Sequence, residues 1–281
     1  SVFDGLRIDH IDGLYNPGEY LRNLRKLCGP DIYIIAEKIL ERDEKLPRDW
    51  PVQGTTGYDF LSLSNNLFTN PESERILTRY YEKKTGVKAS LKQQQIEKKA
   101  LILSRYMQGE VRNLYRYLLE LELCPVKTKI PGDKIREAIS AFLVYFPVYR
   151  LYEESFPMRE KAYKVIRSTW KAIRKDGYAD PEATALMSGI FRKAQYGKDP
   201  GFSRRAMCFF LRCMQFTGPL IAKGVEDTLM YTYGRLIGRN DVGDHPANFG
   251  LEPAGFHKAM KRRQEKWPLT LNATSTHDTK R

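Results

Sequence analysis

The hydrophobic pattern predicts two short strands joined by a helix near the N-terminus. Residues 2–8 (VFDGLRI) are largely apolar, and residues 32–36 (IYIIA) form a continuous β-branched and aromatic run, typical of a strand buried on both faces. Between them, residues 17–27 place apolar side chains on one helical face, and Gly29-Pro30 ends the helix. A unit of this order predicts parallel strands connected by a crossover helix.

Two further segments have the character of strands or strand-entry turns. Residues 55–60 (TTGYDF) are expected to form a third short strand or the turn that enters one. Residues 269–274 (LTLNAT) are predicted to form a final strand that leads directly into STHDTKR. The segments 46–54 and 244–253, which are rich in Pro, Gly, Asn or Trp, are predicted loops.

The middle of the chain has the periodicity of helices. One set of apolar residues, spaced by three or four positions, predicts a single long helix with one apolar stripe that packs against other helices: Ile96, Ala100, Leu103, Met107, Val111, Leu114 and Leu118. Further helices are predicted over residues 134–145, 158–175, 181–194 and 203–217, and in the later part of 219–240.

This arrangement favours an α/β fold that is part of a (β/α)8 TIM-type barrel with a large, mostly helical insertion. Residues 1–70 and 219–281 would supply barrel strands and helices, and residues 71–218 would form the insertion subdomain. In such barrels the catalytic residues lie at the carboxyl ends of the strands. The ends of the predicted strands are therefore the places to search for chemistry.

Composition narrows the class of protein. The 281 residues are 42% hydrophobic and 29% charged, as in a globular domain, and no apolar run reaches the roughly 18 residues needed to span a membrane. No signal peptide is visible, and we expect a piece of a longer protein, because the chain begins and ends inside predicted elements. The four cysteines form no CxxC pair and are expected to be free thiols in the cytoplasm.

The net charge of +13 raises the possibility of nucleic-acid binding. Most of the basic residues lie on the polar faces of predicted helices, and no RNA- or DNA-binding motif accompanies them. We therefore expect no nucleic-acid partner, although a basic helical module that binds nucleic acid or protein stays the alternative from another functional class.

Three carboxylates follow the predicted strands. Asp9 ends the first strand, Glu37 the second and Asp278 the last. Arg7 lies two positions before Asp9, so an extended strand directs both side chains to one face, where the guanidinium would keep Asp9 ionised. Retaining glycoside chemistry needs such a pair, one ionised nucleophile and one protonated acid. Helix capping or ion pairing of these carboxylates is the alternative that spacing alone leaves open.

Three motifs resemble the α-amylase family of glycoside hydrolases and transferases. Residues 5–9 (GLRID) are similar to its second conserved segment, residues 32–38 (IYIIAEK) to its third, and residues 276–278 (THD) to its fourth, in the same order. The resemblance implies that Asp9 is the nucleophile and Glu37 the general acid/base. It also implies that Asp278, with His277, holds the substrate and stabilises the transition state.

Longer segments resemble the trehalose-forming branch of that family, among them DGLRIDHIDGLYNP, LPRDWPVQGTTGYDF and LNATSTHDTKR. The resemblance implies an isomerase that converts the reducing-end α-1,4 bond of a maltooligosaccharide to an α,α-1,1 bond by intramolecular transfer. It implies an α-1,4-glucan substrate. We expect no cofactor, and no metal site because the sequence has only four His residues, none at metal-ligand spacing to Cys. The oligomeric state is not predicted.

One departure from the wider family concerns the acceptor side of the site. Many amylases have Lys-His three and four residues after the nucleophile, where this sequence has Asp12 and Gly13. We expect Asp12 and His10 to contact the leaving glucose, and Tyr58 to stack on a sugar ring. Arg7 and His277 complete the expected substrate contacts.

Two other functions within the family stay open, a plain α-glucan hydrolase and a 4-α-glucanotransferase. A protein that keeps a glucan-binding cleft without turnover is a third possibility. The family's first conserved segment and several barrel strands are not in this sequence, so we expect little activity from the isolated chain.

Overall fold

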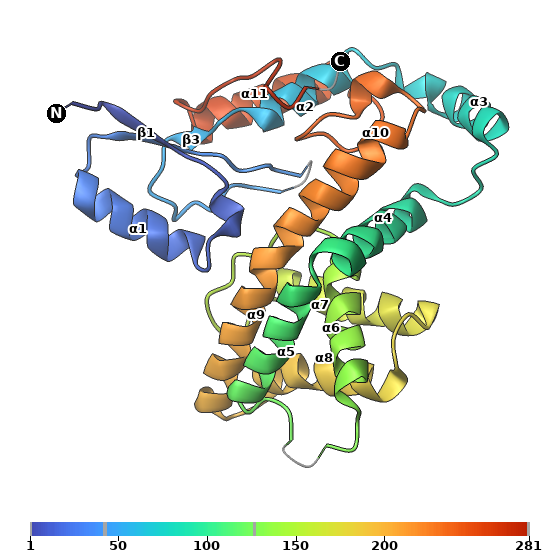
Figure 1. Ribbon diagram of the computed structural model, residues 1–281. Helices are drawn as coiled ribbons and strands as arrows, with labels where there is room; N and C mark the ends of the chain where they lie inside the picture. The colour runs from blue at the N-terminus through green and yellow to red at the C-terminus, as the bar shows by residue number, and fades with distance from the viewer. Residues whose placement is uncertain (1, 42–43, 126–127, 280–281) are drawn as a thin grey trace. The chain divides into compact units, whose positions relative to one another are not determined.

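The computed structural model describes residues 2–41, 44–125 and 128–279, which form two compact units (Figure 1). The first unit comprises residues 1–95 and 225–281, and the second comprises residues 96–224. The first holds a small parallel sheet, and the second is helical, so the chain is a helix-rich α/β protein. None of the described helices is long and apolar enough to cross a membrane.

The sheet of the first unit has the order β1-β2-β3, with all three strands parallel. The strands are β1 (Gly5–Ile8), β2 (Tyr33–Ala36) and β3 (Gly54–Thr55). The predicted parallel pairing of the first two strands is confirmed, with Gly5 opposite Tyr33 and Ile8 opposite Ala36. The carboxyl ends of β1 and β2 therefore lie level with each other.

The crossover helix α1 (Pro17–Cys28) has the predicted bounds to within one residue. The Asn16 side chain accepts from the Glu19 amide and caps its first turn. At its other end Arg25 donates to the carbonyls of Ile32 and Pro51, which ties the helix to the segments that enter β2 and β3.

The TTGYDF segment divides between a strand and a helix. β3 covers only Gly54–Thr55, and α2 (Tyr58–Leu67) begins three residues later, so the second half of the segment is helical. A helix that the sequence pattern did not reveal, α11 (Pro253–Lys266), packs on α2 (Figure 1). Its apolar residues are few and none is buried, so it lacks a clear apolar stripe.

The predicted strand over residues 269–274 is wrong. The segment runs beside β3 and donates one backbone hydrogen bond, from Leu271 to the Thr55 carbonyl. The Thr55 amide, however, is bound by the side-chain hydroxyl of Thr270, 3.0 Å away, and not by a backbone carbonyl. The Leu271 carbonyl accepts a hydrogen bond from the side chain of Arg263. Side chains have thus replaced the ladder bonds on which a strand depends.

The single long helix predicted from the apolar stripe is also wrong. The chain forms α4 (Leu91–Tyr106) and α5 (Gln108–Glu120), separated at Met107, whose φ of −122° and ψ of 24° leave the helical region. Gly109 follows the break and has low helix propensity. The stripe nevertheless packs as expected, because Leu103 and Leu114 are buried on both sides of the break in one core.

The remaining helices agree with the predicted segments of the helical block, with ends that differ by a few residues. They are α6 (Gly132–Tyr145), α7 (Glu160–Asp176), α8 (Pro181–Tyr196) and α9 (Pro200–Ile221). Shorter elements are η1 (Ile11–Gly13), η2 (Pro71–Ser73), α3 (Glu74–Thr85), a π-helix η3 (Ala222–Leu229), α10 (Met230–Thr232) and η4 (Ile237–Arg239).

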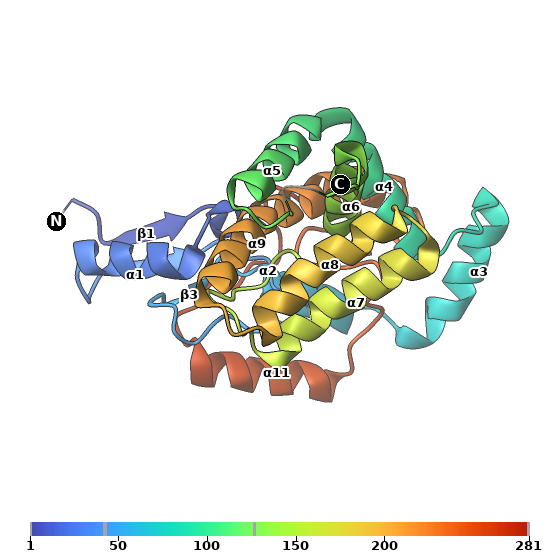
Figure 2. The same cartoon turned by 90° about the horizontal axis from the view of Figure 1, so that it is seen from below.

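The second unit has an aromatic core. α7 and α8 run side by side (Figure 2), and both contact α6. Trp170 of α7 stacks on Phe142 of α6 with ring centroids 5.0 Å apart, and Phe191 of α8 lies 5.4 Å from the same ring. Such stacked and tilted pairs add to the free energy of burial, so this unit has a sizeable core of its own.

Candidate active site

The two carboxylates at the ends of β1 and β2 share one guanidinium. Arg7 Nη1 lies 2.7 Å from Asp9 Oδ1, and Arg7 Nη2 lies 3.0 Å from Glu37 Oε1. The backbone amide of Glu37 continues the strand pairing through the Ile8 carbonyl, at 2.8 Å. The His10 amide donates to the second oxygen of Glu37 at 2.7 Å. The orientation of both carboxylates is therefore fixed by the strands and by Arg7.

The two carboxylates differ in their surroundings. The Asp9 side chain is 69% exposed, whereas that of Glu37 is only 16% exposed. A hydrogen bond from Glu37 and the contact with Arg7 lower the pKa of Asp9 below its ordinary value. The contact with Arg7 therefore favours the ionised form of Asp9, and Glu37 is the less exposed of the two carboxylates.

The turn after Asp9 packs the His10 ring against a glycine. His10 has a left-handed backbone, with φ 45° and ψ 49°, and leads into η1. A Cβ atom added to Gly13 would lie 2.6 Å from Nε2 of the His10 ring, closer than any side chain can approach. The absence of a side chain at position 13 therefore makes room for the ring.

Asp12 is not brought to the carboxylate pair. Its side chain is buried, and Oδ2 lies 3.4 Å from Lys38 Nζ. Lys38 is fully buried and also contacts Glu44 Oε2 at 3.0 Å. Burial lowers the pKa of Lys38, but the carboxylates of Asp12 and Glu44 raise it more, so the ammonium stays charged. This ion pair joins the turn after Asp9 to the segment after Glu37.

Tyr58 binds the third carboxylate, Asp278. Its hydroxyl donates to Asp278 Oδ2 at 2.5 Å, and its ring is only 2% exposed. Burial, the hydrogen bond to Asp278 and the nearby charge of Glu37 raise the pKa of Tyr58 far above its ordinary value. His277, which is exposed, has Nε2 3.5 Å from Asp278 Oδ1. The structure thus pairs Asp9 with Glu37 through Arg7 and holds Asp278 on Tyr58, which feels the charge of Glu37. These three carboxylates are called the carboxylate set.

Two glycines allow close backbone approaches at the start of α2. Gly57 has φ 95°, and a Cβ there would lie 2.6 Å from the Ala273 amide nitrogen. Gly243 has φ 88°, and a Cβ there would lie 2.7 Å from Tyr58 Cβ. Only glycine adopts such φ values readily, and only glycine leaves space for these approaches.

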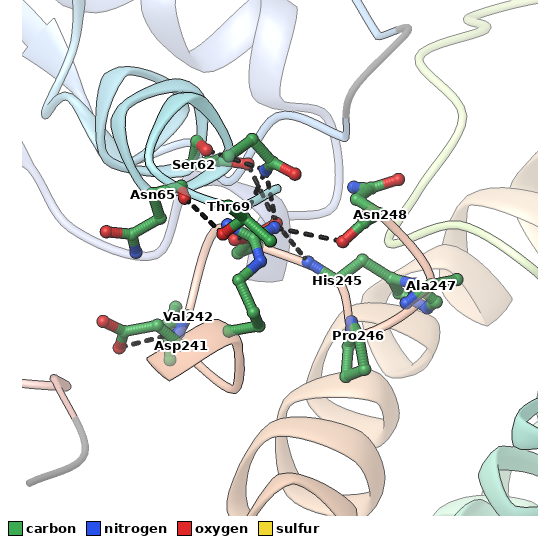
Figure 3. A network of polar contacts seen from close by, with 12 residues as sticks. Ser62, Asn65, Thr69, Asp241, Val242, His245, Pro246, Ala247 and Asn248 are labelled. Atoms are coloured by element: carbon green, nitrogen blue, oxygen red, sulfur yellow. Dashed lines mark hydrogen bonds and ion pairs between the residues drawn. The ribbon is translucent and has the colours of Figure 1, made fainter. Parts of the chain in front are cut away.

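The loop that carries Gly243 is fixed to α2 by a buried charge. Asp244 accepts from Ser62 Oγ at 3.1 Å, from Asn66 Nδ2 at 3.2 Å and from the His245 amide at 2.8 Å, and it lies 2.5 Å from Arg239 Nη2. Figure 3 shows Ser62 of α2 facing His245 of the loop across this network. The network sets the position of the loop against the helix that begins with Tyr58.

Asp244 also gives the first unit a pH-dependent stability. Burial raises the pKa of Asp244 to about 6, and Arg239 only partly opposes this. Between the ordinary carboxyl pKa and 6, the folded state binds a proton that the unfolded state does not, so stability falls as pH rises through this range. Relative to Asp244→Asn, we expect the wild type to lose up to about 3 kcal/mol in total as pH rises from about 3 to about 7, with most of the loss between about pH 4 and pH 6.

Urea denaturation of both proteins from pH 4 to pH 7 measures this difference. The other titrating groups, including His245, are common to both proteins and cancel. A difference that stays constant, or that grows with pH, would mean that Arg239 holds the carboxylate ionised throughout.

A second prediction concerns the Tyr58 hydroxyl. Tyr58→Phe leaves the ring in place but removes the bond to Asp278, and a hydrogen bond to a charged group contributes about 1.5–3 kcal/mol. We expect Tyr58→Phe to lower the free energy of unfolding by an amount near the lower value, because Asp278 is partly accessible to water. Chemical denaturation checks it against Tyr80→Phe, an exposed position expected to change stability by less than about 0.5 kcal/mol. Equal effects of the two substitutions would contradict a structural hydrogen bond at Tyr58.

Sequence reasoning missed the supporting residues. Lys38 was not among the predicted site residues. It directly follows Glu37 at the end of β2, so its side chain points to the opposite face of the extended chain, toward the interior. Asp244 lies in a segment predicted only as a loop and its partner Arg239 in one predicted as helical, and no signal in one sequence connects the pair to α2. Among the residues that the structure describes, no group of three or more His, Cys, Asp or Glu side chains could hold a metal ion.

Comparisons with curated proteins and with solved structures find the same kind of relative. No protein-family model matches the chain. A protein of Mycobacterium tuberculosis named as a maltooligosyl trehalose synthase is 31% identical over the whole chain. The chain is similar over its full length to maltooligosyl trehalose synthases. It spans 34% of the length of the mycobacterial synthase.

Solved structures of such synthases give the same result. The maltooligosyltrehalose synthase of Arthrobacter ramosus has 32% identity and a TM-score of 0.79, over 99% of this chain and 33% of that one. The structure from Sulfolobus tokodaii has 31% identity and a TM-score of 0.71, over 99% of this chain and 32% of that one. The similarity to these synthases therefore includes the backbone around the carboxylates.

Proposed function

We propose that the chain carries the catalytic carboxylates of an intramolecular transglycosylation that forms maltooligosyl trehalose. The observation that supports this most is the shared guanidinium, since Arg7 binds both Asp9 and Glu37 at neighbouring strand ends. The similarity to maltooligosyl trehalose synthases over the whole chain supports this reaction class.

In the first step Asp9 attacks the anomeric carbon of the penultimate glucose of a maltooligosaccharide. The bond from that carbon to O4 of the terminal glucose breaks, and Glu37 donates its proton to O4. The product is a glycosyl ester on Asp9 together with a free glucose that stays bound. The lowered pKa of Asp9 keeps the nucleophile ionised for this attack.

In the second step the freed glucose turns and presents its own anomeric hydroxyl to the ester carbon. Glu37, now a carboxylate, removes the hydroxyl proton while the bond to Asp9 breaks. Two inversions at one carbon retain its α configuration, and an α-configured hydroxyl of the acceptor gives the α,α-1,1 bond. Asp278 would stabilise the oxocarbenium-like charge in both steps.

The remaining site residues receive roles that follow from their surroundings. Tyr58 is buried and bound to Asp278, which favours a positioning role over the stacking expected from sequence. Asp12 is engaged by Lys38, which favours support of the turn rather than direct contact with sugar. His10 and His277 stay proposed substrate contacts, with Arg7 acting on the carboxylates.

The architecture proposed with this function is part of a (β/α)8 barrel. The three parallel strands would be consecutive barrel strands, and the helical region 71–218, most of which belongs to the second compact unit (96–224), would be an insertion. The four free cysteines are compatible with the reducing cytoplasm that we propose as the location.

A hybrid protein tests the function. This chain would replace the equivalent third of the Arthrobacter ramosus synthase, and maltopentaose would be the substrate. We expect a non-reducing, trehalose-capped product of unchanged chain length. New reducing ends would instead indicate a hydrolase, and longer oligosaccharides a 4-α-glucanotransferase. We expect the separate chain to be inactive, and a trehalose-capped product formed by it alone would overturn that expectation.

A soluble but inactive hybrid needs one further measurement. Calorimetric titration with maltopentaose would then show whether the hybrid binds substrate. Binding that is lost in Arg7→Ala would support a glucan site, and an absence of binding would contradict the proposed function.

A further inference from the structure

The segment 269–274, which leads to the third carboxylate, is held by side chains rather than by a ladder. Its Leu271 amide donates to the Thr55 carbonyl at 3.1 Å, and its Thr270 hydroxyl accepts from the Thr55 amide at 3.0 Å. A Cβ atom at Gly57 would lie 2.8 Å from the Leu271 carbonyl oxygen. The segment therefore lies close to the start of α2 without the regular bonds that would fix a strand there.

Asp278 lies in a small turn with its own hydrogen bonds. The Thr276 hydroxyl accepts from the Asp278 amide at 3.2 Å, and the Thr279 hydroxyl accepts from the Thr276 amide at 2.9 Å. The turn meets α2 at the Tyr58 hydroxyl, which donates to Asp278 and is also approached by Thr276. For the two to meet, the segment before the turn must lie at a fixed place against α2.

One guanidinium joins that segment to the residue next to Tyr58. Arg263 of α11 donates from Nη2 to the Leu271 carbonyl at 3.0 Å and to Asn272 Oδ1 at 2.8 Å. Its Nη1 forms an ion pair with Asp59 Oδ2. Asp59 follows Tyr58 directly in the first turn of α2, and Asn272 lies shortly before the turn. Arg263 therefore bridges the two chain segments that meet at the Tyr58 hydroxyl.

The surroundings of the bridge favour a fixed geometry. The side chains of Arg263 and Asp59 are 13% and 18% exposed, so solvent screens their ion pair only weakly. Asp59 Oδ1 also accepts from the Thr55 hydroxyl at 2.9 Å, which orients the carboxylate. A planar guanidinium can bind a carboxylate and a carbonyl at the same time in set directions, whereas a lysine ammonium is a single point charge.

We propose that Arg263 is a positioning residue for Asp278. By binding Asp59 and the Leu271 carbonyl together, it holds the segment against α2 so that Asp278 receives the Tyr58 hydroxyl. The consequence for turnover rests on the proposed function. Because Asp278 would stabilise charge that develops in the transition state, its displacement is expected to lower kcat more than it changes KM.

A double-mutant cycle on the whole chain tests the placement without any need for activity. Tyr58→Phe removes the bond to Asp278 and should raise the unfolding constant of the first unit about tenfold. Arg263→Lys keeps a positive charge beside Asp59 but loses the fork to the segment. In that background we expect Tyr58→Phe to raise the unfolding constant by less than about threefold, because Asp278 no longer keeps its place. The matched control Arg262→Lys, at the exposed neighbouring position of α11, should leave the effect of Tyr58→Phe unchanged.

Asp59→Asn opens the bridge from its other end and serves as a second background. Asn has the same shape and can still accept from the Thr55 hydroxyl, but it no longer pairs with the charge of Arg263. We expect the same weakened effect of Tyr58→Phe, and this background decides if Arg263→Lys does not fold. A full effect of Tyr58→Phe in either background would overturn the proposal.

Turnover in the hybrid synthase tests the catalytic consequence. Arg263→Lys is expected to lower kcat at least about tenfold with KM changed less than about twofold, whereas Arg262→Lys keeps both. An unchanged kcat in Arg263→Lys would overturn the catalytic part of the proposal. A wild-type hybrid that neither turns over nor binds maltopentaose would contradict the proposed function instead, and the cycle on the chain would still decide the placement of Asp278.

Discussion

Replacing Glu37 by Gln in the hybrid synthase is expected to lower kcat by about 10²–10⁴-fold, the usual contribution of a general acid/base. Gln keeps the size of the side chain and can still accept from the His10 amide, but it cannot donate a proton to the leaving O4. Asp9→Asn should abolish turnover more completely, because no glycosyl ester can form. Both are measured as trehalose-capped product formed from maltopentaose.

The leaving group separates the roles of the two carboxylates. A maltooligosyl fluoride or aryl glycoside departs without protonation, so Glu37→Gln should recover most of the first step with such a substrate. Asp9→Asn should not recover, because the nucleophile is still missing. Glu41→Gln is the matched control, since this glutamate lies four residues away and outside the carboxylate set, and it should keep full activity. Recovery of Asp9→Asn with the activated substrate would contradict the assigned roles.

Replacing Lys38 by Met is expected to destabilise the first unit by about 3–5 kcal/mol, the usual cost of leaving a buried charge without its partner. Lys38 is fully buried between the carboxylates of Asp12 and Glu44, and Met fills a similar volume without charge. Urea denaturation of the chain measures the loss. Lys45→Met, at an exposed position between β2 and β3, should change stability by less than about 0.5 kcal/mol.

The pH dependence distinguishes lost charge pairing from lost packing. At low pH the two orphaned carboxylates can take up protons, so the cost of Lys38→Met should shrink between pH 7 and pH 4. Poor packing of Met would instead cost the same at each pH. A destabilisation no larger than that of Lys45→Met would show that the buried pair is not needed for stability.

The sequence alone predicted the part of the fold that local pattern determines. The apolar run of β2 and the capped, one-sided α1 specified a parallel unit, and Asp9 and Glu37 lie at its ends as that unit requires. Pattern failed where side chains replaced backbone bonds, as Thr270 does beside β3. It failed again at Met107, where the apolar stripe continues across the break between α4 and α5. Both helices pack into one core, and this shared core keeps the spacing of the apolar residues regular across the break.

The supporting residues of the site could not be predicted for a different reason. The contact between Gly243 and Tyr58 joins positions far apart in the chain, and neither residue type indicates its partner. Asp12 was predicted to face the sugar because it is polar and near the nucleophile. Its burial depends on Lys38, whose importance becomes visible only when β1 and β2 are side by side.

The packing of the His10 ring over Gly13 limits how this turn can change during evolution or engineering. A histidine installed at position 13, as in many amylases, would collide with the ring that already occupies the space. A side chain at position 13 therefore requires the His10 ring to leave this space first. The order of changes in the turn matters, because replacing His10 before Gly13 avoids the collision that the reverse order meets.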